Sequence, residues 1–70
     1  MDITRAVRMS GYTQIELAAM VNMDKWQFNK KLRGWNGMRF DPEQVEILRA
    51  LGGPIAALMN EQYPLPVEVA

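Results

Sequence analysis

Residues that start and stop helices recur at short intervals along this 70-residue chain, and they limit it to short helices. Thr13, with Glu16 three positions later, has the spacing of a capping box, and Asp24 with Gln27 repeats that spacing. Asn22 lies between the two, and asparagine is the non-glycine residue that best accepts a positive φ. These signals predict two short helices joined by a tight turn.

Similar signals divide the rest of the chain. They are a cap at Asp2, a stop at Ser10–Gly11, a start at Asp41–Pro42, a stop at Gly52–Gly53 and a start at Pro54. Pro64 and Pro66 disfavour a helix beyond Tyr63. We therefore expect an all-α fold, a compact bundle of four to five short helices containing a helix-turn-helix. It divides into a domain of residues 1–62 and a tail of residues 63–70, a candidate oligomer contact.

Apolar residues at helical spacing predict the core. Each of the first four helices has such a stripe: Ile3, Ala6, Val7; Leu17, Ala18, Val21; Phe28, Leu32; Val45, Leu48, Leu51. We expect Trp35 to close the core beneath the Gly34–Gly37 loop. The methionines are interpreted as core filler: Met1, Met9, Met20, Met23, Met38 and Met59. A further apolar set either completes the monomer core or forms a dimer contact: Ile55, Leu58, Met59, Tyr63 and Leu65.

Composition argues against several classes of function. The chain has no cysteine and no histidine, which removes thiol chemistry, the usual zinc ligands and the commonest general base. Its carboxylates form no recognisable pair, so we expect no enzyme, no catalytic residue, no metal site and no cofactor. No apolar run is long enough for a bilayer and no export signal is visible, so we expect a cytoplasmic protein without membrane contact.

Charge is distributed unevenly although its sum is zero. Residues 25–40 contain five basic residues and no acid, whereas residues 1–24 carry a net charge of −1 and residues 41–70 a net charge of −4. Such a block is often only a solvated helix face. On the second helix of a helix-turn-helix, it is the place where DNA contact is expected.

The helix predicted over 24–33 has two distinct sides. At about 100° per residue, Phe28 and Leu32 face the core together. The opposite side carries the candidate base-contacting residues, whose groups can meet base edges in the major groove: Trp26, Asn29, Lys30 and Arg33. The candidate phosphate-contacting residues are Gln14, Lys25, Lys31 and Arg39. Arg5 and Arg8 are expected to be solvated.

The residues of this region resemble a known group of regulators. The run from Thr13 to Ala18 is similar to the start of the helix-turn-helix in the lambda repressor/Cro superfamily, and the run from Phe28 to Leu32 resembles the recognition helix of lambdoid Cro repressors. The stretch from Met23 to Phe28, with Trp35 and Phe40, resembles phage CII activators.

This resemblance implies a phage or prophage transcriptional regulator, repressor or activator, that binds operator DNA as a homodimer or higher oligomer. RNA polymerase is a further candidate partner. It also implies that Gln14 touches phosphate and that the exposed side of the helix over 24–33 sits at the groove.

A second interpretation is a helix-turn-helix fold reused as a protein-binding module or inhibitor. Zero net charge, the acidic C-terminal half and Trp26 favour it, because tryptophan is enriched at the energetic centres of interfaces. Trp26 can also pack back against the first helix or the loop, which we favour over a base contact.

Overall fold

The computed structural model describes residues 2–64, and in this range every regular element is helical. The five α-helices are α1 (Ile3–Met9), α2 (Gln14–Met20), α3 (Lys25–Leu32), α4 (Pro42–Ala50) and α5 (Gly53–Gln62), with a short 3₁₀ turn, η1 (Trp35–Gly37), between α3 and α4. The predicted all-α class is confirmed. None of the helices within residues 2–64 combines the length and apolar character needed to cross a membrane.

The helices begin where the capping residues predict. The Asp2 carboxylate accepts a hydrogen bond from the Arg5 N–H, although at 3.4 Å this is long. The Asp24 carboxylate accepts from the Gln27 N–H at 2.8 Å. Before α4, the Asp41 N–H donates to the side-chain oxygen of Gln44 at 2.9 Å. Local hydrogen bonds therefore define most of the helix starts.

The capping box of α2 is complete. The Glu16 N–H donates to the Thr13 hydroxyl at 3.1 Å, and the Thr13 N–H donates to the Glu16 carboxylate at 2.8 Å. The backbone N–H and the hydroxyl of Thr13 lower the pKa of Glu16 from its usual 4.5. A lowered pKa in the folded state means that ionised Glu16 stabilises the fold above pH 4.5, and that this contribution disappears as the pH falls through the lowered value.

We therefore expect Glu16→Gln to reduce the acid sensitivity of the protein. The amide can still accept from the Thr13 N–H, but it has no charge to lose. Urea unfolding of both proteins, measured from neutral pH down into the acid range, checks this. Glu43→Gln in α4 removes one carboxylate at another helix start and controls for net charge. Equal acid sensitivity of the Glu16→Gln variant and the wild type would mean that the charge of Glu16 does not stabilise the fold.

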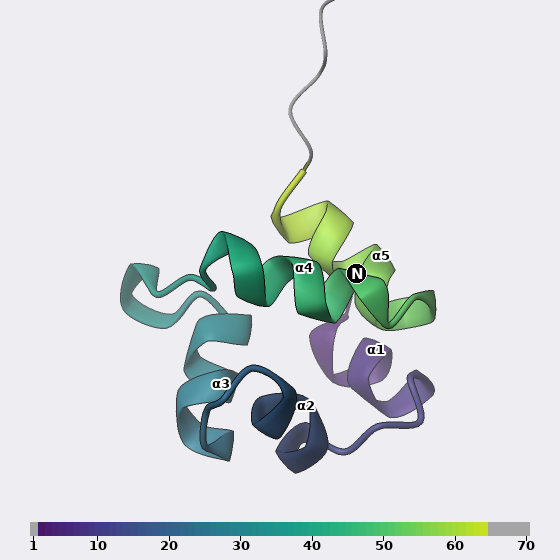
Figure 1. The fold of residues 1–70 in the computed structure, drawn as a ribbon, viewed down its shortest axis with the longest axis horizontal. Coiled ribbons are helices and arrows are strands. Elements are labelled where there is room, and N and C mark those ends of the chain that lie inside the picture. The colour runs from purple at the N-terminus through teal and green to yellow at the C-terminus, as the bar shows by residue number, and fades with distance from the viewer. Residues whose placement is uncertain (1, 65–70) are drawn as a thin grey trace, which may run out of the picture.

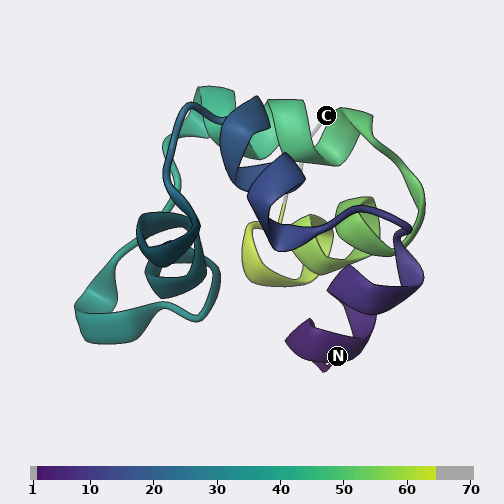
Figure 2. The ribbon, with the colours of Figure 1, turned by 90° about the horizontal axis from the view of Figure 1, so that it is seen from below.

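The helices pack in two groups. α5 contacts both α4 and α1, and Figure 2 shows α5 lying between them. α2 and α3 pack against each other, below α4 and α5 in Figure 1, and α2 also contacts α4. The segment that carries η1 projects beyond the end of α3 (Figures 1 and 2).

One core joins these helices. Its buried members are Ala6, Leu17, Ala18, Val21, Phe28, Leu32, Phe40, Val45, Leu48, Ile55, Leu58 and Met59. Ile3, Val7 and Leu51 pack against it partly buried. Of the two alternatives for α5, the structure therefore shows its apolar residues completing the monomer core; Leu65 lies outside the described residues. Tyr63, assigned to the tail, accepts a hydrogen bond on its hydroxyl from the Phe40 N–H at 2.9 Å and is half-buried.

The prediction that methionines fill the core was wrong for two of them. Met9 is 63% exposed, at the edge of an open cavity of about 410 Å³ between α1 and Pro54. Met20 is exposed because it lies about 100° around α2 from the inward-facing Val21. Met59 is buried, and Met23 and Met38 are half-buried; Met1 lies outside the described residues.

Candidate nucleic-acid interface

The turn between α2 and α3 holds the two helices in a fixed relation. Asn22 has a φ of 58°, as its position predicted. The Met23 N–H donates back to the Ala18 carbonyl at 2.9 Å, which closes the turn. Ala18 is buried at the packing surface of α2, and a small side chain there lets the helices approach closely.

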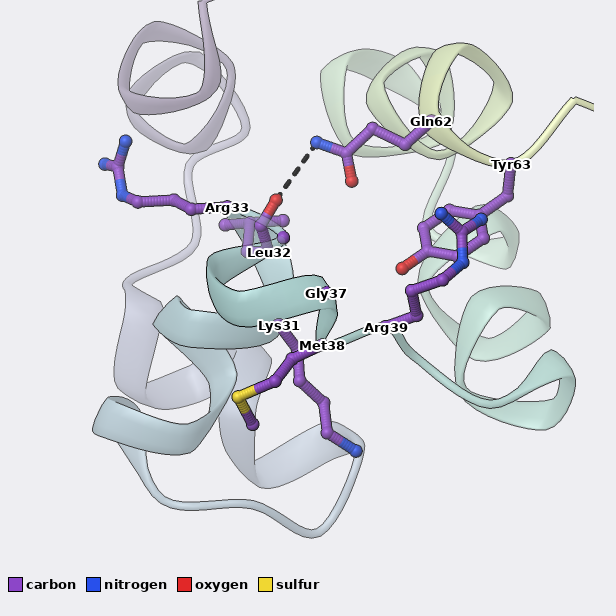
Figure 3. A pocket seen from close by; sticks show the side chains of 9 residues that line it. Lys31, Leu32, Arg33, Gly37, Met38, Arg39, Gln62 and Tyr63 are labelled. Atoms are coloured by element: carbon purple, nitrogen blue, oxygen red, sulfur yellow. Dashed lines mark hydrogen bonds between the residues drawn. The ribbon is translucent and has the colours of Figure 1, made fainter.

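α3 packs against the core through one side. Phe28 and Leu32 are buried, and the Phe28 ring lies 5.3 Å from that of Phe40, centroid to centroid. At the C-terminal end of α3, the Gln62 side chain donates to the Leu32 carbonyl at 3.1 Å (Figure 3). With this side packed, the opposite side of α3 faces solvent.

The solvent side of α3 joins the start of α2. A depression of about 240 Å³ is lined by Gln14, Lys25, Trp26, Asn29 and Lys30. A smaller one, of about 110 Å³, shares Gln14 and Asn29 with the first and extends to Arg33 and to α1. The two form one continuous surface, the α3 face, which we define by six residues: Gln14, Lys25, Trp26, Asn29, Lys30 and Arg33.

The α3 face thus contains six of the eight residues predicted to contact DNA, and the other two lie elsewhere. Lys31 and Arg39 line a cavity of about 350 Å³ between α3, the η1 turn and the end of α5, which meets the α3 face at Arg33. Figure 3 shows that they do not converge: Arg39 lies against Tyr63, 4.5 Å from the ring centroid, whereas Lys31 extends away from both. Arg33 points to the opposite side of α3, toward α1.

The α3 face is rich in hydrogen-bond donors. It carries two ammonium groups, one guanidinium group and two side-chain amides, and no carboxylate lines either depression. The Arg33 guanidinium donates to the Thr4 hydroxyl at 3.0 Å, which directs it along the surface. Such donors can bind phosphate oxygens and the acceptor atoms of base edges.

The packing expected for the two tryptophan rings was wrong. Trp26 is 72% exposed and does not pack back onto α1 or the loop; the Lys25 ammonium lies 5.2 Å from its ring centroid. Trp35 is 57% exposed and does not close the core. The rings of Phe40 and Tyr63 pack together there. Helical spacing identified the outward side of Trp26, but no sequence signal showed that neighbouring elements leave both rings uncovered.

Sequence analysis missed Thr4, which orients Arg33 from α1. This contact joins residues 29 positions apart, and no local pattern indicates it. Arg5 and Arg8 are exposed, as expected. Among the described residues, 2–64, no cluster of carboxylates suited to a metal ion occurs.

Comparison of the chain with models of protein families, with curated proteins and with solved structures finds no match.

Proposed function

We propose that the protein is a sequence-specific DNA-binding transcriptional regulator of phage or prophage type, with α2 and α3 acting as a helix-turn-helix. The observation that carries this proposal is the α3 face, which gathers cations and amides without a carboxylate. A helix such as α3, with its side chains, is about 10–12 Å in diameter, and the major groove, about 12 Å wide, admits a helix of that diameter.

The side chains of the α3 face fit two roles. Asn29 pairs with adenine through its amide, and Lys30 and Arg33 donate to guanine. Trp26 offers an apolar edge to a thymine methyl group. Gln14, at the first position of α2, and Lys25, at the first position of α3, are placed for phosphate contacts beside the groove.

Lys31 and Arg39 have a different role in this proposal from the one expected. Because they line another cavity, they add to the positive potential around α3 instead of entering the same groove.

The resemblance to lambda repressor/Cro and CII regulators also implies binding as a homodimer or higher oligomer. On that basis the operator contains two half-sites about one helical turn apart.

Selection from a pool of randomised duplex DNA tests the proposal. The full chain is mixed with the pool at about 50 and 200 mM salt, and the retained duplexes are sequenced. We expect a short enriched motif, repeated about one turn apart, and an affinity that falls steeply with salt because phosphate contacts release counterions. No retention of duplex at the lower salt would overturn the proposal.

A second candidate function, a protein-binding module or inhibitor, is favoured by the exposure of Trp26. A large exposed aromatic ring on a helix is typical of the centre of a protein interface. This function requires that Trp26 matters more for binding than Lys30 and Arg33, and that salt has little effect. If the chain retains no duplex in the selection experiment, this second function is favoured.

A further inference from the structure

Trp35 lies in a hydrogen-bonded local turn that leaves its ring exposed. Gly34 and Asn36 both have positive φ, 66° and 57°, and they reverse the chain directly after α3. The Gly37 N–H donates to the Gly34 carbonyl at 3.1 Å, and the Met38 N–H donates to the Trp35 carbonyl at 3.0 Å. The indole is 57% exposed and is not part of the core. A large aromatic ring presented in this way contributes little to the stability of the monomer.

Lys30 connects Trp35 to the α3 face. Its ammonium lies 5.2 Å from the centroid of the Trp35 ring. Lys30 also lines the larger depression together with Trp26, which precedes it by four positions on the same side of α3. The three residues form a row of aromatic ring, cation and aromatic ring, which we name the tryptophan row.

We propose that Trp35 is a further DNA-contacting residue, whose indole packs against a deoxyribose of the duplex backbone beside the groove. This inference rests on the proposed function. The backbone of DNA alternates anionic phosphates with apolar sugar faces, and the tryptophan row alternates in the same way between ring and cation. A protein partner fits this surface less well, because lysine is depleted at the centre of protein interfaces.

In this arrangement Trp35 has two effects on binding. Its ring covers apolar sugar surface, and its contact with Lys30 holds the ammonium toward the DNA instead of letting it move freely. Trp35→Ala should therefore weaken duplex binding about tenfold, the scale of one aromatic anchor. Trp35→Phe keeps a ring at the same place and should lose much less.

Fluorescence tests the contact directly, because Trp26 and Trp35 are the two tryptophans of the chain. In the Trp26→Phe variant, tryptophan emission comes from Trp35 alone, and in Trp35→Phe it comes from Trp26 alone. Each variant is mixed with randomised duplexes at about 50 mM salt, where phosphate contacts are strong. Quenching is measured with acrylamide, which is neutral and therefore not repelled by DNA. We expect duplex to protect Trp35 from the quencher.

The outcomes separate the inference from the function on which it rests. Fluorescence anisotropy of labelled duplex measures binding independently of the tryptophans. If duplex binds but leaves Trp35 as accessible as before, and Trp35→Ala binds as tightly as the wild type, the inference is overturned and the proposed function stands. Stronger protection of Trp35 by single-stranded DNA than by duplex also overturns it, since that result indicates stacking on bases. If no duplex binds, both fall.

Discussion

Phe28→Ala is expected to lower the free energy of unfolding by about 3–5 kcal/mol, the usual cost of removing a buried phenylalanine. Phe28 is 1% exposed, and its ring packs 5.3 Å from Phe40, which in turn lies 6.3 Å from Tyr63. A domain of 70 residues has only about 4–10 kcal/mol of stability in total, at the usual 0.05–0.15 kcal/mol per residue. The loss should therefore remove about a third of the total stability or more.

Urea unfolding followed by circular dichroism measures this loss. Phe28→Leu is the matched control: it keeps an apolar side chain at the site, so a smaller loss is expected. Because Phe28 attaches α3 to the core, Phe28→Ala should also lose DNA binding, and Phe28→Leu should retain it. A loss of stability below about 1 kcal/mol would mean that α3 is not held through this contact.

Lys30→Ala is the substitution expected to have a large effect on DNA binding without affecting the fold. Lys30 is exposed, lines the larger depression of the α3 face and is not part of the core. If its ammonium contacts a base, removing it should cost about 1–3 kcal/mol of binding free energy and relax the sequence preference at one position. Binding measured on the enriched duplex and on single-base variants of it checks both effects.

Lys31→Ala is the control for Lys30→Ala, because it removes the same charge from the neighbouring position. Lys31 lines the cavity on another side of α3, so its loss should be smaller and equal on every duplex. Repeating both measurements at several salt concentrations separates a phosphate contact from a base contact, since only the former changes the salt slope. Equal, sequence-independent losses for the two variants would contradict base contact by Lys30.

Tertiary contacts decided which of the predicted DNA-contacting residues share a surface. The basic block of residues 25–40 suggested one site, and helical geometry placed Trp26, Asn29, Lys30 and Arg33 on one side of α3. Gln14 joins them because α2 and α3 pack together, and this packing follows from Ala18 and Phe28. Arg39 lies elsewhere because the chain turns back after η1 toward α5, where Tyr63 stacks with it.

The helices could be predicted from local sequence, because helix starts and stops depend on residues three or four positions apart. The Thr13–Glu16 box, the cap at Asp24 and the positive φ at Asn22 are local interactions, and local residues predict them. Which apolar side chains are covered could not be predicted in this way. Exposure depends on the elements that pack nearby, and within residues 2–64 no element covers Trp26 or Trp35, so both rings are exposed beside basic side chains of α3.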